Sequence, residues 1–344
     1  MDTIGLDVHK RETQVCILTA DGELLERRIA TTRERLGALF GRRPRARVLL
    51  EASTESEWVA RHLEALGHEV IVADPGFAPM YAARSRRVKT DKRDARALCE
   101  ACKLGAYRPT HRVSDAQRHV RAELAVRDAL VRTRTRYVAL IKAAVRREGL
   151  RLSQGDPERT AAKLRALPLP EATARELAPL VALLEPLNAA ITAADRRLAR
   201  LATESSAAQR LMSMPAVGPV TALGFVAALD DVGRFGAAHQ VEAYLGLVPS
   251  EHSSGERQHR GRVTKRGDSR TRWLLVEAGW RVRRSKDPAL APLNAWADRI
   301  AARRGKRVAV VALARRLAGI LYAMWRDDAP YATQRVGAAT PAAA

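Results

Sequence analysis

Apolar and polar residues alternate in short blocks along the first third of the chain, and this pattern predicts strands and helices joined by turns. Turn residues such as Asp21 and Gly22 separate the runs that have strand character. The predicted strands cover residues 4–8, 12–19, 23–30, 47–51 and 68–73. Helical spacing of apolar residues predicts helices at residues 32–40, 55–66 and 91–104.

This order of elements, three strands followed by alternating helices and strands, is that of the ribonuclease H fold, an α/β class. Two acidic residues stand out in it, because Asp7 interrupts the first apolar strand and Glu51 ends the fourth. In that fold these two strands are parallel neighbours, about 5 Å apart. An isolated carboxylate in a central apolar strand is unfavourable unless it is paired or binds a metal. We therefore expect Asp7 and Glu51 to lie together in a polar site.

Asp91 and Asp94 lie three positions apart on a predicted helix, so they share one helix face. Together with Asp7 and Glu51 they would offer an oxygen-rich site for Mg²⁺, and two metals held in this way support phosphodiester chemistry. Such a pair is also common as a solvated face or a helix-dipole effect, and Asp7 alone could cap a strand end. The four carboxylates in this fold order favour the metal site.

A basic segment directly precedes Asp91 and carries Arg84, Arg86, Arg87 and Lys89. Positive charge beside a carboxylate cluster would guide a nucleic-acid backbone to the metals. The alternative is a solvated loop that happens to be basic.

The three cysteines are too few for a disulfide framework, which fits a reduced cytoplasm. Cys99 and Cys102 have the spacing of a zinc-binding pair, but the chain has no second such pair. We therefore interpret Cys99 and Cys102 as core cysteines of a helix.

Apolar residues at helical spacing predict long helices over residues 115–150 and 171–204. These helices would form a hairpin, either a coiled coil that dimerises or a plain helical spacer. Residues 214–222 contain a Gly-Pro turn between apolar helices, which resembles the helix-hairpin-helix element. Further on we expect a loop over residues 250–272, with Ser253 and Ser254 in its Ser-rich part; its basic turn carries Lys265 and Arg266, which are candidate nucleic-acid contacts.

The expected domains are a catalytic domain (residues 1–110), a helical middle (111–206), a mainly helical C-terminal domain (207–328) and a disordered tail (329–344). The longest apolar run near the C-terminus, residues 308–314, is far shorter than the ~20 residues that cross a bilayer. Strand character begins with the first residues, so we expect no signal peptide and no membrane association. The expected location is the cytoplasm.

The chain has 344 residues, and 60 Lys+Arg against 38 Asp+Glu give it a net charge of +22. A hydrophobic content of 47% excludes wholesale disorder. The excess positive charge favours a polyanionic partner, and nucleic acid is the first candidate. A genome that prefers Arg over Lys would explain the choice of basic residue, but not the shortage of acidic residues that would balance it.

Several motifs together resemble one family, the DEDD transposases of bacterial insertion sequences, which are serine-dependent recombinases guided by a bridge RNA. The resemblance spans about residues 1–325, and its most specific piece is the Lys-Thr-Asp-x-x-Asp-Ala block at residues 89–95. The other motifs lie at residues 4–10, 50–53, 214–222, 253–255 and 261–272.

The resemblance implies an N-terminal domain like that of the Holliday-junction resolvase, with the four carboxylates as its catalytic, metal-binding tetrad. It implies that Ser254 is a nucleophile that forms a phosphoserine link to DNA, with Ser253 as the nearest alternative. It also implies a guide RNA, donor and target DNA, and a homo-oligomer, dimer or tetramer, in which the acidic and serine parts meet. Strand exchange through such an intermediate needs no ATP, and the chain has no P-loop sequence.

Two other functions remain as alternatives. A metal-dependent nuclease of the Holliday-junction type would use no serine, and the Ser-Gly block at residues 254–255 argues against it. A non-catalytic nucleic-acid-binding protein would not need the four carboxylates.

Overall fold

The computed structural model describes residues 1–81, 90–254 and 257–332. The chain forms two compact units, Met1–Arg112 and Val113–Ala344. Each unit is described by itself below. The division of the second unit near residue 206 stays a prediction.

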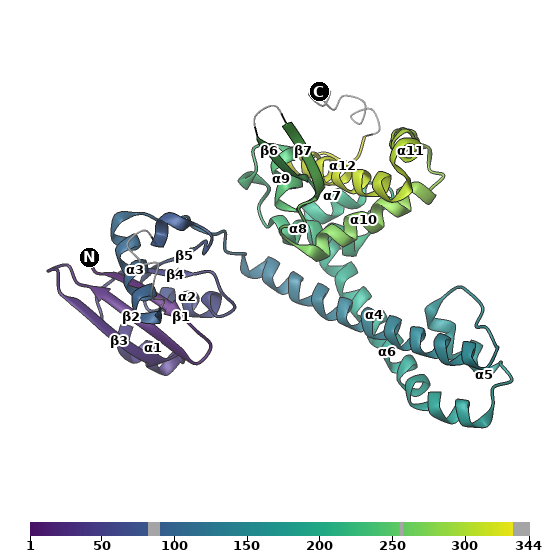
Figure 1. The fold of residues 1–344 in the computed structure, drawn as a ribbon, viewed down its shortest axis with the longest axis horizontal. Coiled ribbons are helices and arrows are strands. Elements are labelled where there is room, and N and C mark those ends of the chain that lie inside the picture. Colours follow the sequence, from purple (N-terminus) through teal and green to yellow (C-terminus); the bar gives the residue numbers. More distant parts are fainter. Residues whose placement is uncertain (82–89, 255–256, 333–344) are drawn as a thin grey trace. The chain divides into compact units, whose positions relative to one another are not determined.

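A five-stranded sheet in the order β3-β2-β1-β4-β5 forms the centre of the first unit (Figure 1). β1 pairs antiparallel with β2 and parallel with β4, while β3 and β5 form the edges. This confirms the predicted mixed α/β architecture and the parallel pairing of the first and fourth strands. The strands are β1 (Thr3–Val8), β2 (Glu12–Leu18), β3 (Leu24–Ala30), β4 (Arg47–Glu51) and β5 (Glu69–Ala73).

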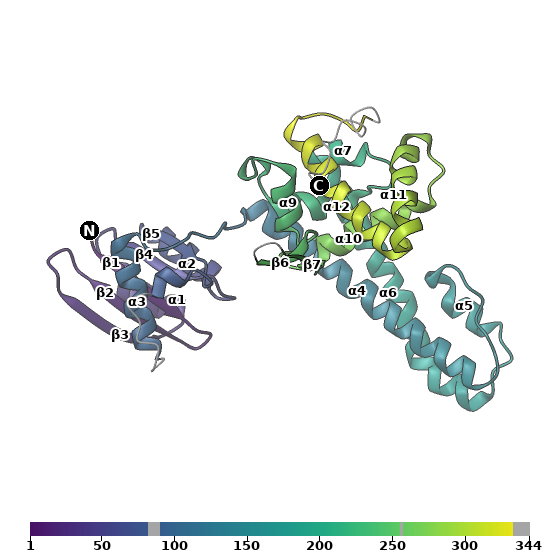
Figure 2. The same ribbon diagram turned by 45° about the horizontal axis from the view of Figure 1, so that its top comes forward.

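Helices cover both faces of this sheet (Figure 2). On one face, α1 (Arg33–Phe40) and α2 (Ser56–Ala65) pack their apolar residues against the side chains of β1 and β4 that point that way. On the other face, α3 (Asp91–Leu104) packs against Leu49 and Ala73. A short 3-10 helix, η1 (Ala78–Tyr81), belongs to the same layer as α3.

Gly5 brings α3 unusually close to the central strand. A β-carbon on Gly5 would lie 2.2 Å from the carbonyl oxygen of Ala95 and 2.2 Å from the backbone nitrogen of Cys99. Only a residue without a side chain fits there. Asp7 is two residues further along β1, so its side chain points to the same face, toward the start of α3.

All three cysteines are free and buried, which confirms the predicted core position of Cys99 and Cys102. Cys16 and Cys99 pack together between β2 and α3. Burial raises the pKa of the Cys102 thiol to about 12, so it is a neutral, apolar core residue.

The N-terminal part of the second unit contains two long antiparallel helices, α4 (Asp115–Arg147) and α6 (Glu171–Glu204). They run side by side in both views (Figures 1 and 2). Their outer ends share a small core that includes Ile141 and Leu184. η2 (Pro157–Arg159) and α5 (Thr160–Arg165) connect these ends.

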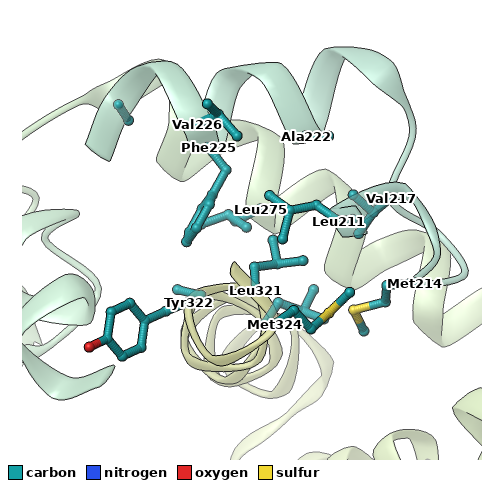
Figure 3. Close-up of a cluster of buried hydrophobic side chains, with 14 of the residues drawn as sticks. Leu211, Met214, Val217, Ala222, Phe225, Val226, Leu275, Leu321, Tyr322 and Met324 are labelled. Atoms are coloured by element: carbon teal, nitrogen blue, oxygen red, sulfur yellow. The ribbon is translucent and has the colours of Figure 1, made fainter. Parts of the chain in front are cut away.

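The main core of this unit surrounds α8 (Pro219–Leu229), in which every residue from 221 to 229 is buried. Phe225 of α8 packs near Leu275, and Leu321 and Tyr322 project from α12 into the same core (Figure 3). The Tyr322 hydroxyl donates a hydrogen bond to the Phe235 carbonyl at 2.6 Å. The remaining helices are α7 (Ser206–Met212), η3 (Val232–Arg234), α9 (Ala238–Tyr244), α10 (Ser269–Arg284), η4 (Pro288–Leu290), α11 (Ala291–Arg304) and α12 (Lys306–Arg326).

Two helices, α6 and α12, are long and apolar enough to cross a membrane by length and composition alone. Core helices of soluble proteins pass the same test. Both helices contribute buried residues to the main core of the second unit, α12 many more than α6.

A polar hairpin occupies the first part of the stretch, residues 250–272, in which a loop was expected. β6 (Pro249–Ser254) and β7 (Arg257–Val263) pair antiparallel. The prediction of a loop was wrong because strands are recognised in a sequence by alternating apolar residues, and these two strands lack that alternation. They are evident only from the pairing of their backbones.

The first part of the expected tail packs against the second unit. The backbone N–H of Tyr331 donates to the Ser213 hydroxyl at 2.9 Å, and the Tyr331 hydroxyl donates to the Ala289 carbonyl at 3.1 Å. Residues 333–344 lie outside the described residues.

Candidate functional site

Three side chains meet at the end of β1. The Nε2 atom of His9 lies 3.3 Å from Oδ2 of Asp7 and 3.6 Å from Oδ1 of Asp91. One ligand atom from each of the three residues lies within 4.8 Å of the other two, which is a spacing that a single metal ion can bridge. Asp7 is buried, whereas His9 and Asp91 are exposed, so the group opens to solvent on one side.

The start of α3 is fixed next to this group by its cap. The Thr90 side chain accepts a hydrogen bond from the backbone N–H of Arg93 at 3.4 Å, which begins the helix at Asp91. The first turn of α3 therefore carries Asp91, and it carries the buried Asp94 as well.

The electrostatics of Asp7 are those of a buried acid among other acids. Burial raises the pKa of the Asp7 carboxyl; His9 opposes this, and the Asp91 and Asp94 carboxylates add to it. The Oδ2 atom of Asp7 is buried and accepts no hydrogen bond. A divalent cation would supply the charge that this oxygen lacks, so the residues fit a metal site.

Glu51 stands at the corresponding end of the neighbouring strand. Leu6 of β1 is paired in parallel with Leu50 of β4, so Asp7 and Glu51 follow at the same level of the two strands. Glu51 is half-buried. The tight group found among the described residues does not include Glu51 or Asp94, although Asp94 is near enough to act on Asp7.

His9 is the member of this group that the sequence-based prediction missed. It follows Asp7 by two residues, and this strand periodicity was the available signal. Its backbone is held by hydrogen bonds: the Thr31 hydroxyl donates to the His9 carbonyl at 2.8 Å, and the Thr31 and Thr13 hydroxyls are 2.8 Å apart. Thr13 and Thr31 are both buried.

Ser253 and Ser254 belong to β6 in the second unit. Ser254 is the last residue of this strand, and its backbone is paired with that of Arg257 on β7. Gly255, which follows it, lies outside the described residues.

The basic turn after β7 is a tightly built structure. Gly246 and Gly267 have positive φ angles of 67° and 70°, and a β-carbon on either would lie within 2.2 Å of backbone atoms of the facing segment. The Arg272 guanidinium donates to the carbonyls of Leu245 at 2.9 Å and Arg266 at 2.5 Å. These constraints hold the turn in one conformation.

Two cations project from this turn. Lys265 has a φ of 56°, which is uncommon for a residue with a side chain. Lys265 and Arg266 are both exposed. The Asp268 side chain accepts from the backbone N–H of Thr271 at 2.5 Å and so begins α10 directly after the turn.

Comparisons with known proteins agree over both units. A DEDD transposase model of the IS110 elements matches residues 4–148, and a model described as the transposase IS116/IS110/IS902 family matches residues 208–293. A probable family 20 transposase of Pseudomonas aeruginosa is 30% identical, with 96% of this chain and 98% of that protein covered. The chain belongs to the IS110/IS116 transposase family.

Transposases of named insertion sequences are among the other relatives of this transposase. The transposase for IS1111A of Coxiella burnetii is 27% identical over 95% of this chain and 90% of its own length. The transposase for IS1328 of Yersinia enterocolitica is 28% identical over 93% of this chain and 95% of its own length. The protein is therefore a DNA transposase, it acts on DNA, and its DEDD domain uses a divalent metal.

Other predicted site residues of the transposase stand as follows. In the turn between α7 and α8, Gly218 caps α8 and Ala216 has a φ of 75°. The basic residues before α3 fall in the stretch 82–89, outside the described residues. They are Arg84, Arg86, Arg87 and Lys89.

Proposed function

We propose that this transposase cuts and rejoins DNA in a Mg²⁺-dependent reaction that passes through a phosphoserine intermediate on Ser254. A non-coding RNA guides it, and it works in the bacterial cytoplasm at the nucleoid. The observation that carries the proposal is the buried Asp7 oxygen without a hydrogen-bond donor, next to His9 and Asp91, in a chain of the IS110/IS116 family.

The four acidic residues form the metal-binding part of the proposed site in a ribonuclease-H-like domain. Asp7 and Asp91 bind directly, and Glu51 and Asp94 complete the oxygen-rich surroundings at the ends of β4 and α3. A divalent metal at this site would polarise a DNA phosphate and stabilise the oxygen that leaves it. Mg²⁺ is the ion proposed, because carboxylate oxygens are its preferred protein ligands.

Ser254 supplies the nucleophile in this proposal, with Ser253 as the alternative. Its hydroxyl gives up a proton as Oγ attacks a DNA phosphorus, a Ser–O–P bond forms, a P–O bond of the DNA backbone breaks, and the leaving oxygen takes up a proton. The reverse exchange with another DNA end restores the serine hydroxyl. One ester replaces another at each step, so the reaction needs no ATP. In the hairpin the backbone of Ser254 pairs with that of Arg257, a basic residue.

Basic residues bind the DNA and the guide RNA. Lys265 and Arg266 contact phosphates from the constrained turn after β7, and Arg84, Arg86, Arg87 and Lys89 contact the strand near Asp91. The net charge of +22 supports a polyanionic partner such as DNA or RNA. The turn between α7 and α8 adds backbone amides in the manner of a helix-hairpin-helix element.

The transposase forms a homo-oligomer, dimer or tetramer, through the coiled-coil middle, residues 111–206. Large apolar side chains are exposed on these helices within a single chain. Val126 and Leu140 of α4 are 51% and 50% exposed, and Leu183 of α6 is 49% exposed. Burial of these residues against another copy would remove apolar surface from water.

A denaturing gel of labelled DNA tests the serine step. In the presence of Mg²⁺, the wild-type protein should give a shifted protein–DNA band, and Ser254→Ala should abolish this band while DNA binding persists. Ser253→Ala is the matched control and should be far milder. A band that survives Ser254→Ala contradicts the assignment, and loss only in Ser253→Ala identifies the neighbour as the nucleophile. Cleavage without any covalent band would indicate a metal-dependent nuclease of the Holliday-junction type.

A further inference from the structure

His9 lies where a metal ligand would lie. Its Nε2 atom is 3.3 Å from Oδ2 of Asp7 and 3.6 Å from Oδ1 of Asp91. Adjacent ligands that each lie about 2.1 Å from one octahedral ion are ~3 Å apart, and opposite ligands are ~4.2 Å apart. Both distances from His9 fall within this interval, and one ligand atom from each of the three residues lies within 4.8 Å of the other two, so the three side chains are close enough to share one ion.

We infer that His9 is a direct ligand of the divalent ion, together with Asp7 and Asp91. This inference rests on the proposed metal site and names one further ligand of it. An imidazole nitrogen favours first-row transition ions, whereas carboxylate oxygens suit Mg²⁺ and Mn²⁺ alike. A site with two carboxylates and one imidazole therefore binds Mn²⁺ more tightly than Mg²⁺, although it accepts both.

A second observation, independent of the spacing of the three side chains, points to a bound cation. Asp7 is only 8% exposed, and its Oδ2 atom, which faces His9, is buried without a hydrogen bond. Such an oxygen is unfavourable unless something positive completes its surroundings. One ligand atom from each of Asp7, His9 and Asp91 lies within 4.8 Å of the other two.

The backbone of His9 is prepared for this role. The Thr31 hydroxyl donates to the His9 carbonyl at 2.8 Å, and the His9 backbone N–H donates to the Glu12 carbonyl at 3.1 Å. Thr31 is in turn hydrogen-bonded to the buried Thr13. A residue exposed at a strand end is thus fixed at its main chain on both sides, which reduces the ordering that metal binding requires.

A competing explanation is that His9 pairs with the two carboxylates in place of a metal ion. A protonated His9 would act as a charge partner of the two carboxylates and would compete with a metal ion. Removal of His9 would then strengthen metal binding. If His9 is a ligand, its removal weakens metal binding, so the two explanations predict changes of opposite sign.

The experiment uses the full chain, freed of nucleic acid in high salt. Mn²⁺ affinity is measured by electron paramagnetic resonance titration, and Mg²⁺ affinity by competition against Mn²⁺. His9→Asn replaces the nitrogen ligand by an amide of similar size, and His119→Asn, at an exposed position of α4, is the matched control. We expect His9→Asn to weaken Mn²⁺ binding by about tenfold or more and Mg²⁺ binding much less, while His119→Asn changes neither.

A spectroscopic signature keeps the test independent of any variant. Wild-type protein with ¹⁵N-labelled histidine should show electron spin-echo modulation from a nitrogen bound to Mn²⁺. Absence of this nitrogen coupling, or Mn²⁺ binding that is unchanged or tighter in His9→Asn, overturns the inference. If Asp7→Asn and Asp91→Asn weaken metal binding and His9→Asn does not, only the role of His9 fails. If the two aspartate variants bind metal like the wild type, the proposed acidic site itself fails.

Discussion

Gly5 of β1 and Ala95 of α3 approach so closely that a β-carbon on Gly5 would lie 2.2 Å from the Ala95 carbonyl oxygen. This contact lies two residues before Asp7 on the strand and one residue after Asp94 on the helix. The distance between the strand and the helix at the candidate metal site is therefore set by the absence of a single side chain.

Gly5→Ala should push α3 away from β1, because the new methyl group meets backbone atoms that cannot rotate aside. We expect a loss of stability of about 1–3 kcal/mol and weaker metal binding, measured by urea denaturation and Mn²⁺ titration. Gly37→Ala in α1 is the control, since its β-carbon would meet only the His62 side chain at 3.8 Å. Alanine favours helices, so Gly37→Ala should be neutral or should stabilise by up to ~1 kcal/mol. Equal effects of the two substitutions would contradict this account.

Asp94→Asn should separate folding from metal binding. The substitution removes one charge and keeps the shape of a buried side chain, so the thermal unfolding midpoint should change little. Metal affinity and DNA cleavage should fall by about tenfold or more. Asp21→Asn, in the exposed turn between β2 and β3, should change neither. If both Asp94→Asn and Asp7→Asn cleave DNA as well as the wild-type protein does, the proposed metal site is wrong.

Thr31→Val should disturb the metal site from a distance. Valine keeps the branched shape but loses the hydroxyl that donates to the His9 carbonyl and contacts Thr13. We expect a loss of about 1–3 kcal/mol of stability and a lower Mn²⁺ affinity, and Thr31→Ser should restore both because serine keeps the donor. A serine variant that behaves like the valine variant would show that packing, and not the hydrogen bond, is what matters.

Lys265→Ala and Arg266→Ala should each reduce the salt dependence of nucleic-acid binding. Each lost phosphate contact lowers the log–log slope by roughly 0.7–0.9. The wild-type protein should also copurify with RNA at low salt, which an ultraviolet absorbance spectrum detects. Lys265→Arg keeps the charge and should keep the slope. A slope that does not change in either alanine variant would place the phosphate contacts elsewhere.

Glu57 should make the stability of the first unit depend on pH. Its burial opposes ionisation, but hydrogen bonds from Arg112 and Arg61 outweigh burial and lower the pKa of the Glu57 carboxyl below 4.5. The contribution of ionised Glu57 to stability is therefore present above about pH 4.5. It is lost as the pH falls through the lowered pKa of Glu57. Glu57→Gln should reduce stability at pH 7 by about 0.5–1 kcal/mol, and the difference from wild type should vanish in acid. Glu23→Gln, at an exposed position before β3, is the matched control.

The sequence predicted the first unit well because its signals are local. Alternating apolar residues mark the strands, and α3 begins and ends where predicted because Thr90 caps its start and Gly105, with a φ of 67°, ends it. The pairing of β1 with β4 followed from the order of elements. The expectation that Asp7 and Asp91 share one site came from the order of elements in the ribonuclease H fold.

Other features could not be predicted because they depend on distant partners. The β6–β7 hairpin is held by backbone pairing between polar segments, which leaves no apolar pattern in the sequence. The approach of His9 to Asp91 requires the end of β1 and the start of α3 to meet. An expected site of oxygen ligands alone also gives no reason to include a histidine. Tyr331 is fixed by Ser213 and Ala289, which are far from it in the chain.

The paired helices α4 and α6 contain 33 and 34 residues, and at 1.5 Å per residue each spans about 50 Å. The small core at their outer ends is thus held at a set distance and a set rotational phase from the main core of the second unit. Each residue added to a helix turns everything beyond it by about 100°. Removal of seven residues from both helices, close to two full turns, would shorten the hairpin and keep its faces aligned. Removal of two residues from both helices would turn the outer end almost to the opposite side. The length of the hairpin therefore sets both the distance and the orientation of its outer end.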